Sequence, residues 1–265
     1  MQPEHWVVLP TYNEAENIYG MLDALRQLPL SLGVLVVDDN SPDGTADIVL
    51  GFKAQHPNFQ VELLRRPQKE GLGRAYEAGF RWLLERTSAC YIYEMDADFS
   101  HPPSYLPRLA QALEEVDMVI GSRYVQGINV VNWPLSRILL SYGASWYVRI
   151  ITGMPIKDPT AGFVGYRRGL LERILSIGSI RFRGYAFQIE MKYKAFLAGA
   201  KWREVPIVFV ERMAGRSKMT RQVIQEAVWG VIWLRWYRRR IRTALRQQAS
   251  SIQNADFARA LSSGE

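Results

Sequence analysis

One stretch decides how the rest of the sequence is interpreted: Tyr91-Ile92-Tyr93-Glu94-Met95-Asp96-Ala97-Asp98-Phe99-Ser100-His101-Pro102-Pro103. Its first five residues are typical of a strand, and two aspartates follow where that strand ends. In an open α/β sheet, ligands bind beyond the carboxyl ends of the strands, and two carboxylates on one turn can hold a divalent cation. Aspartate is also common in solvated turns and helix caps. The pair therefore indicates a metal-dependent phosphate site only if other loops support it.

The composition limits the class of protein. The chain has 265 residues, of which 48% are hydrophobic, and this suits one α/β domain with a substantial core. Its formal net charge of +7 favours an anionic partner, such as a nucleotide, a nucleic acid or a phospholipid surface. We expect no signal peptide, and no membrane span because no apolar run reaches about 18 residues.

The sequence contains a single cysteine, Cys90. We place it in an apolar strand, so we expect a buried structural thiol rather than a catalytic one. Because one cysteine cannot form an internal disulfide, the chain fits a reducing, cytosolic setting.

Short apolar runs alternate with helical patterns in the first half of the chain. The expected strands are residues 6–9, 34–37, 61–64, 91–95 and 118–121. Their starts recur at roughly the 30-residue spacing of a βαβ unit, which predicts a doubly wound, mostly parallel sheet flanked by helices. Asn13, with Glu16 three residues later, is expected to cap the first helix.

The second half is less regular. We expect a long helix over residues 133–151, a turn at 158–163 and another helix from 184. Residues 202–210 are interrupted by Pro206 and therefore suit an edge strand. A last helix is predicted over 220–246, and the polar tail 247–265 is expected to be disordered.

Polar or acidic loops follow three of the predicted strands, at residues 10–14, 38–45 and 96–103. If these strands are neighbours in one sheet, the loops share one cleft. The sequence lacks both the dinucleotide glycine fingerprint and the P-loop lysine pattern. A bound diphosphate would then need a metal ion and cationic side chains.

Four cations lie in suitable positions for such a ligand. Arg123 follows the fifth predicted strand, and Arg137, Arg212 and Lys218 come later. Any one of them alone could be a solvated surface charge. Arg123, Arg212 and Lys218 lie among turn residues and glycines, a setting typical of mobile loops that grip phosphate.

Four segments in this order resemble family 2 glycosyltransferases of the dolichyl-phosphate mannose synthase group. They are residues 9–14, 36–45, 95–103 and 121–124. The resemblance covers residues 5 to about 220, and segments 158–163, 184–191 and 206–218 are similar to the polyprenyl-phosphate branch. It implies a GT-A Rossmann-like catalytic domain over 1–219, ahead of the helix 220–246.

The resemblance also implies roles for residues at the donor side. Five residues would hold the guanosine of GDP-mannose: Pro10, Tyr12, Glu14, Val37 and Asp39. Asp96 and Asp98 would bind Mg²⁺ or Mn²⁺ at the diphosphate, with Ala97 packed beside it. Ser100 stands where one relative has a third metal ligand, a glutamine, so water would complete the coordination here.

The remaining residues would serve the acceptor and the reaction. The implied catalytic set is Asp98, Arg123, Arg212 and Lys218, of which the three cations also contact the donor phosphates. Arg123, Arg137 and Ser141 would bind the acceptor phosphate. The implied reaction is an inverting transfer of mannose from GDP-mannose to a polyprenyl (dolichyl-type) monophosphate. An ionised phosphate needs positioning and no strong base, so Glu190 is expected to be structural or to contact the sugar.

The helix 220–246 combines a broad apolar surface with a basic end. Its apolar residues are Val223, Ile224, Ala227, Val228, Val231, Ile232, Leu234 and the tryptophans 229, 233 and 236. Its arginines are Arg235, Arg238, Arg239, Arg240, Arg242 and Arg246. This pattern predicts an amphipathic helix at the cytosolic face of a membrane. A core helix with a solvated end, or a docking helix for a membrane-anchoring subunit, fits the same residues.

Three other functions remain open. The same fold could use UDP-glucose or another nucleotide sugar as donor. A nucleotidyltransferase would release pyrophosphate instead of a nucleoside diphosphate. A basic binder of nucleic acid or of a lipid surface, without enzymatic activity, leaves the aspartate loops unexplained, so no nucleic-acid partner is expected.

Overall fold

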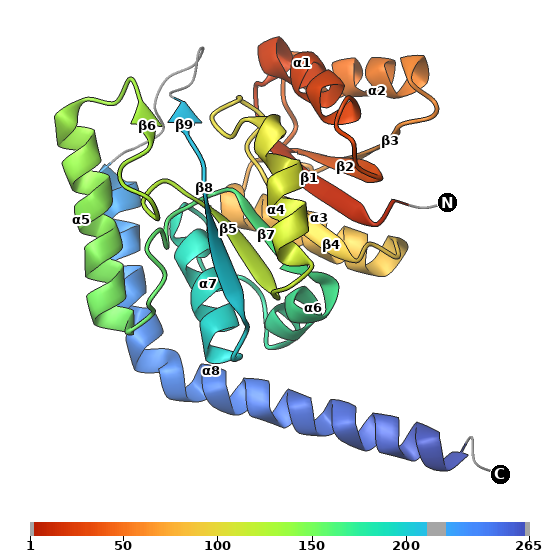
Figure 1. Ribbon diagram of the computed structural model, residues 1–265. Helices are drawn as coiled ribbons and strands as arrows, with labels where there is room; N and C mark the ends of the chain where they lie inside the picture. The colour runs from red at the N-terminus through yellow and green to blue at the C-terminus, as the bar shows by residue number, and fades with distance from the viewer. Residues whose placement is uncertain (1–2, 211–220, 263–265) are drawn as a thin grey trace.

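The computed structural model describes residues 3–210 and 221–262, and in its last helix the side chains of residues 225–247. A seven-stranded sheet with the order β3-β2-β1-β4-β7-β5-β8 forms its centre (Figure 1). The strands are β1 (His5–Thr11), β2 (Leu32–Asp38), β3 (Gln60–Arg65), β4 (Tyr91–Glu94), β5 (Met118–Ser122), β7 (Val164–Arg167) and β8 (Trp202–Pro206). A small second sheet pairs β6 (Val130–Val131) with β9 (Phe209–Val210).

Helices cover both faces of the large sheet. They are α1 (Ala15–Arg26), α2 (Thr45–Gln55), α3 (Leu72–Arg86), α4 (Leu106–Leu113), α5 (Leu135–Thr152), α6 (Arg168–Ser176), α7 (Ala186–Leu197) and α8 (Arg221–Ser262), with a 3₁₀ turn, η1 (Pro103–Tyr105), before α4. Alternate strand residues enter opposite cores, since side chains alternate along a strand. In β1, Val7 and Leu9 pack with α1, α2 and α4, whereas Trp6 and Val8 pack with α3, α6 and α7.

The mostly parallel α/β sheet predicted from the sequence is confirmed, with one insertion. β1 pairs in parallel with β2 and β4, and β5 pairs in parallel with β8. β7 lies between β4 and β5 and is antiparallel to both. The predicted edge strand is also confirmed, because β8 ends the sheet. The sequence patterns missed β7 and α6, since a four-residue strand that passes directly into a helix offers no turn signal.

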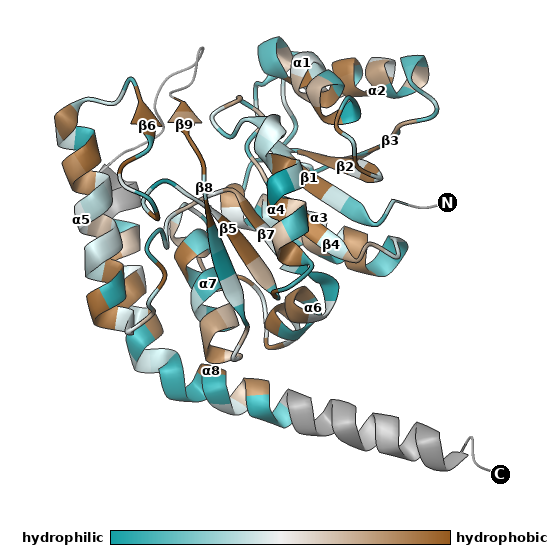
Figure 2. Ribbon diagram, in the orientation of Figure 1, coloured by the Kyte–Doolittle hydropathy of each residue, from teal (hydrophilic) through white to brown (hydrophobic). Residues whose placement is uncertain are grey.

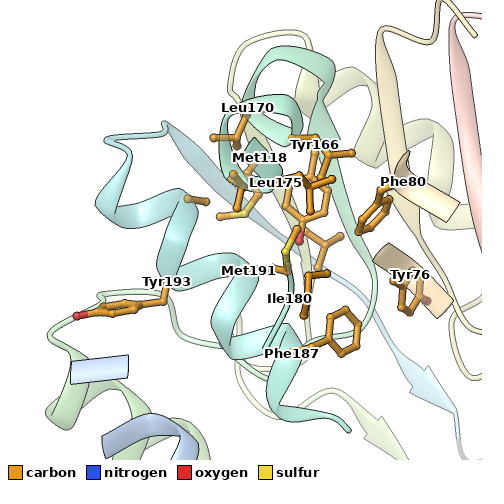
Figure 3. Packing of buried hydrophobic residues seen from close by; sticks show 14 of the residues in the cluster. Tyr76, Phe80, Met118, Tyr166, Leu170, Leu175, Ile180, Phe187, Met191 and Tyr193 are labelled. Carbon is orange, nitrogen blue, oxygen red and sulfur yellow. The ribbon is translucent and has the colours of Figure 1, made fainter. Parts of the chain in front are cut away.

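The core between the sheet and α3, α6 and α7 is rich in aromatic rings. Figure 3 shows Tyr166 of β7 between Phe80 and the side chains of α6 and α7. The rings of Tyr76 and Phe187 stack with centroids 5.1 Å apart, which ties α3 to α7. Large buried rings of this kind contribute much of the stability of a domain.

α8 packs on the body with its first half and then leaves it. Val231, Leu234, Ile241 and Leu245 are buried, and α5 lies alongside the first part of the helix (Figure 1). The predicted helix 220–246 therefore lies largely within α8, but α8 continues to Ser262. The tail that we expected to be disordered is helical to that residue. Its sequence up to Ser262 has no glycine or proline and is rich in alanine and glutamine, which favour helix.

Two local expectations are wrong. Cys90 is exposed, because it precedes β4 on a bend and is not part of the strand. Asn13 does not cap α1, since its φ of 58° places it in the left-handed region, and α1 begins at Ala15. The Ala15 N–H donates instead to Asp43 Oδ2 at 3.0 Å, so the cap comes from the loop after β2.

Gly165 allows β7 to enter the sheet. A Cβ atom at this position would lie 2.7 Å from ring carbons of Tyr93 and 2.9 Å from Val119. We predict that Gly165→Ala lowers the free energy of unfolding by about 1–3 kcal/mol, because the neighbours are packed strands and aromatic rings. Urea denaturation measures this change.

Gly169→Ala in α6 is the matched control. A Cβ atom there meets nothing within 4 Å, so alanine should leave stability unchanged or raise it by up to about 1 kcal/mol through its better helix propensity. Equal effects of the two substitutions would contradict the close packing of β7.

Candidate active site

The loops that follow β1 and β2 are joined by hydrogen bonds. The Thr11 hydroxyl donates to Asp38 Oδ1 at 3.0 Å, and the Asn13 N–H donates to Ser41 Oγ at 3.0 Å. β4 lies on the other side of β1, so its loop is at the same edge of the sheet. The shared cleft predicted for the three loops agrees with this strand order.

The wall formed by the β1 and β2 loops carries charges that the sequence did not single out. Arg66 is buried and donates to Asp39 Oδ1 at 2.5 Å and to Glu70 Oε2 at 2.6 Å. Burial raises the pKa of the Asp39 carboxyl, and the Arg66 charge opposes this shift. The ammonium of Lys69 lies 3.9 Å from the centroid of the Tyr12 ring. Arg66 and Lys69 belong to a run of charged residues that is typical of a surface loop, which is why they were missed.

The other residues expected at the nucleotide differ in exposure. Pro10 and Glu14 are half-buried, and Glu14 Oε2 accepts a hydrogen bond from the Asn17 amide at 3.0 Å. Val37 is fully buried in the core beneath the sheet. Its side chain is therefore a packing element, and contact with a ligand would have to use other atoms of this loop.

The loop after β4 holds the two aspartates in a constrained turn. Asp98 is buried, and its Oδ1 accepts the Ser100 N–H at 3.0 Å. Phe99, between Asp98 and Ser100, has a φ of 60°, a conformation that a bulky residue rarely adopts. Such backbone strain persists only where the surroundings enforce it, and it is common at functional sites.

His101 fixes the start of this loop and was missed as a site residue. Its Nδ1 accepts the Asp96 N–H at 3.2 Å, and its ring packs between Phe163 and Phe209. A Cβ atom on Gly162 would lie 3.0 Å from the imidazole, so a larger residue there would press against the His101 ring. The histidine thus links the aspartate loop to the turn before β7.

The donor set at this loop fits a divalent cation that keeps several water ligands. Asp96 and Asp98 supply carboxylates, and the buried Ser100 hydroxyl has no hydrogen-bond partner among the described residues. Mg²⁺ and similar ions bind through one or two carboxylates plus phosphate and water. In the part of the chain that the structure describes, no group of three or more His, Cys, Asp and Glu side chains could hold a metal alone.

Arg123 follows β5 and is tied to the turn before β7. Its Nε and Nη2 donate to Asp158 at 2.8 and 2.7 Å, and its backbone N–H donates to the same carboxylate at 2.9 Å. Because β7 is antiparallel, its first residue lies beside the ends of β4 and β5. The turn before β7 therefore reaches the site, and Arg123 and Asp158 meet there.

Both members of this ion pair are buried, which makes the pair a firm anchor. Burial alone would raise the pKa of Asp158, but the charge and hydrogen bonds of Arg123 outweigh it and hold that pKa below its usual range. Breaking a buried pair is costly because it leaves an uncompensated charge. The contact of Arg123 with a phosphate stays a prediction.

A buried polar network lies directly behind the aspartate loop. Glu94, the last residue of β4, accepts the Tyr166 hydroxyl at 3.0 Å, and burial raises its pKa to about 7. Lys192 of α7 donates to the Ala161 carbonyl at 2.7 Å and to Gln188 Oε1 at 3.0 Å, and burial lowers its pKa to about 8. No local sequence pattern indicates this network, because Glu94, Tyr166 and Lys192 lie on separate elements.

Glu190 has a structural position. It is buried, accepts the Arg181 and Phe182 N–H groups at 2.9 and 3.1 Å, and pairs with Lys194 at 2.8 Å. Of the two roles expected for Glu190, these contacts support the structural one.

Arg137 and Ser141 lie one turn apart on α5, next to the loop that carries Arg123. Ser141 Oγ accepts the Tyr124 hydroxyl at 2.7 Å. The Arg137 guanidinium lies 4.0 Å from the centroid of the Trp133 ring, and the Arg123 guanidinium lies 5.7 Å from the same ring. The structure thus brings Arg123, Arg137 and Ser141 into one neighbourhood.

Arg212 and Lys218 lie outside the described residues. The last element before them, β9, ends at Val210, and the ring of Phe209 lies 5.7 Å from the Arg123 guanidinium. Their part in the site stays a prediction.

Large apolar and aromatic side chains are exposed at intervals along α5, and Figure 2 shows hydrophobic residues between polar ones on this helix. The exposed residues are Leu135, Leu139, Leu140, Tyr142, Trp146 and Ile150. Leu135 is 70% exposed and Trp146 61%, whereas Ser145 and Thr152 on the same helix are buried. A surface helix usually turns its apolar stripe to the core, whereas α5 buries Val148 and also exposes large apolar side chains.

The neighbouring helix α8, which packs beside α5, also exposes large apolar side chains. Trp229 and Trp236 are exposed, and Arg235, Arg239, Arg240 and Arg242 are exposed beside them. The apolar face predicted for α8 is therefore divided, since Val231 and Leu234 pack inside. No helix within the described residues is both long and apolar enough to cross a membrane.

Sequence comparison finds close relatives that match over nearly their whole length. An undecaprenyl-phosphate mannosyltransferase of Micrococcus luteus is 45% identical over 243 residues, covering 90% of this chain and 98% of the relative. A polyprenol monophosphomannose synthase of Mycolicibacterium smegmatis is 42% identical over 231 residues, covering 85% and 86%.

Solved structures share the fold at low identity. Glucosyl-3-phosphoglycerate synthase of Mycobacterium tuberculosis, in complex with phosphoglyceric acid, has a TM-score of 0.62 at 18% identity, covering 87% of this chain and 79% of that chain. The mannosyltransferase PcManGT of Pyrobaculum calidifontis, in complex with GDP-Man and Mn²⁺, has a TM-score of 0.55 at 18% identity, covering 100% and 80%. These likenesses confirm the GT-A-like α/β architecture.

The family model of "Glycosyl transferase family 2" matches residues 6–175. This range includes β1 to β7, the aspartate loop and the Arg123–Asp158 pair. The resemblance noted in the four sequence motifs is thereby confirmed, and the chain belongs to glycosyl transferase family 2.

Proposed function

We propose that this chain transfers mannose from GDP-mannose to a polyprenyl monophosphate, with inversion at the anomeric carbon. The observation that carries the proposal is how these residues are arranged. The aspartate loop after β4 belongs to the same site as Arg123, Arg123 and Arg137 share the Trp133 ring, and Arg137 lies on α5, which exposes large apolar side chains. Both curated relatives carry names that refer to mannose transfer to polyprenyl phosphates.

The donor side would be formed by the loops after β1 and β2. Tyr12 offers an aromatic face for a base, and Asp39, held by Arg66, offers a carboxylate for base or ribose. Asp96, Asp98 and the Ser100 hydroxyl would hold Mg²⁺ or Mn²⁺ at the diphosphate. The solved complex of PcManGT, which contains GDP-Man and Mn²⁺, supports this choice of donor and metal. When bound, the ion would neutralise charge on the leaving diphosphate.

The acceptor side would be formed by Arg123, Arg137 and Ser141. An acceptor phosphate is already anionic at neutral pH, so its attack on the sugar needs orientation rather than a base. Arg137 can orient a phosphate through its planar set of donors. Arg212 and Lys218 would stabilise the charge that develops on the departing GDP.

The polyprenyl chain would approach from a membrane surface that contacts α5 and the first half of α8. Large exposed apolar patches on a protein mark interaction sites, and tryptophan and arginine suit the headgroup region. The arginines of α8 suit anionic phospholipids. We propose a peripheral association at the cytosolic face, with or without a membrane-anchoring subunit.

The second prediction concerns the reaction. Purified protein with GDP-mannose, a divalent metal and a polyprenyl phosphate should form a mannolipid, measured with a radiolabelled donor. Asp98→Asn should lower the rate by about 100-fold or more, because a lost metal ligand removes several kcal/mol of charge stabilisation. Asp47→Asn, at an exposed surface ion pair, is the control and should keep the wild-type rate.

Transfer from UDP-glucose but not from GDP-mannose would show that the proposed donor is wrong and that the protein uses UDP-glucose. Absence of transfer from every nucleotide sugar, with either metal, would refute it. An Asp98→Asn enzyme of full activity would exclude the metal role of the aspartate loop.

The third prediction concerns the membrane surface. Leu139→Glu combined with Trp146→Glu should weaken binding to vesicles that contain anionic phospholipid by more than roughly tenfold, since each buried side chain of this size contributes about 1.5–3 kcal/mol. Cosedimentation measures binding. Leu50→Glu, an exposed leucine on α2, is the matched control and should bind normally. Unchanged binding of the double variant would contradict the proposed surface.

A further inference from the structure

We infer that Trp133 is a further residue of the acceptor site, where its ring positions Arg137 and its indole N–H donates to the acceptor phosphate. This inference rests on the proposed function and adds a specific residue to it. The family resemblance implies the acceptor residues Arg123, Arg137 and Ser141, and Trp133 lies among them.

Trp133 lies where several parts of the site meet. It comes between β6 and the first turn of α5, and the pairing of β6 with β9 brings its ring against Phe209, with an edge-on contact and centroids 5.3 Å apart. The guanidinium of Arg137 lies over the indole face at 4.0 Å, and that of Arg123 lies at 5.7 Å. The ring therefore contacts both cations that would face the acceptor phosphate.

The ring can set the position of Arg137. A free arginine side chain samples many rotamers, and holding it in one of them costs conformational entropy. A cation over an indole face is attracted by the ring, and tryptophan is the strongest aromatic partner for this contact. A guanidinium that lies over a ring can still present donors at its edge to an anion. Trp133 thus holds the Arg137 side chain in position before the acceptor binds.

The indole N–H provides the second argument. Trp133 Nε1 is buried and has no hydrogen-bond partner among the residues of 3–210 and 221–262. A buried donor without a partner costs free energy, and native structures rarely keep one without a reason. The indole nitrogen can only donate, so its missing partner must be an acceptor. A phosphate oxygen held by Arg137, whose guanidinium lies over the same ring, would meet this requirement once the side chains that cover the indole nitrogen move aside.

A second tryptophan offers a comparison within the same chain. Trp82 of α3 also has an arginine over its ring, with Arg86 at 5.5 Å, and its ring packs against Trp6. This pair lies on a helix that packs against β1 and β2 and is separate from the acceptor residues. Trp82 therefore has the same type of cation contact without a place in the site, which makes it the matched control.

The test measures KM for polyprenyl phosphate and for GDP-mannose with Trp133→Phe, Trp133→Leu and Trp82→Phe. Phenylalanine keeps an aromatic face and loses the N–H, so KM for the acceptor should rise roughly tenfold while KM for the donor stays within about twofold. Leucine loses both and should raise the acceptor KM further. Trp82→Phe should match the wild-type enzyme.

A binding measurement accompanies the kinetics. Farnesyl phosphate should raise the melting temperature of the wild-type protein, and this shift should be smaller in Trp133→Phe and absent in Trp133→Leu. If leucine prevents folding, the phenylalanine variant alone decides. Wild-type acceptor KM and melting shift in Trp133→Phe would overturn the role of the N–H, and the same result in Trp133→Leu would overturn the whole inference.

The outcomes separate this inference from the function on which it rests. If the wild-type protein transfers mannose but the Trp133 variants behave like it, the inference fails and the function stands. If the wild-type protein forms no mannolipid, the function fails, and the melting shifts with farnesyl phosphate still show whether Trp133 binds an isoprenyl phosphate.

Discussion

The buried ion pair between Arg123 and Asp158 is the constraint on which the second half of the site depends. It joins the loop after β5 to the turn before β7. Among the described residues, the main-chain hydrogen bonds between these two segments end at Gly121. Because both groups are buried, neither can separate without leaving a charge in a medium of low polarity. The pair therefore sets where the turn lies, and with it Gly162, against which the imidazole of His101 packs.

Contacts connect this pair to two other parts of the site. Toward β4, His101 connects the turn to the Asp96 N–H, and the Glu94 and Lys192 network supports the same loop from below. Toward α5, the Arg123 guanidinium approaches the Trp133 ring. The proposed donor and acceptor sides would thus be held by the same turn, which suits a reaction that depends on orientation rather than on acid–base groups.

The sequence predicted the parallel part of the fold because each strand there is followed by a loop and a helix, with clear changes of pattern. It did not predict β7, whose four residues lack a boundary, or that this strand would place Asp158 beside Arg123. The aspartate loop was predicted since its carboxylates are adjacent in the chain. Arg66 and Lys192 were not, because their importance comes from partners that are remote in sequence and from burial that no local pattern encodes. Cys90 was predicted wrongly because exposure changes within one residue at the start of a strand.

The position of β7 also has a consequence for synthesis of the chain. β1, β2 and β3 can pair with one another and with β4 as soon as residue 94 has been made. β5, however, pairs only with β7 and β8, which both come later. A growing chain therefore carries β5 without a partner, and β4 with one open edge, until residues 164–167 emerge. Open strand edges promote association between chains, so the interval between residues 122 and 164 is when a nascent molecule most needs the help of a chaperone.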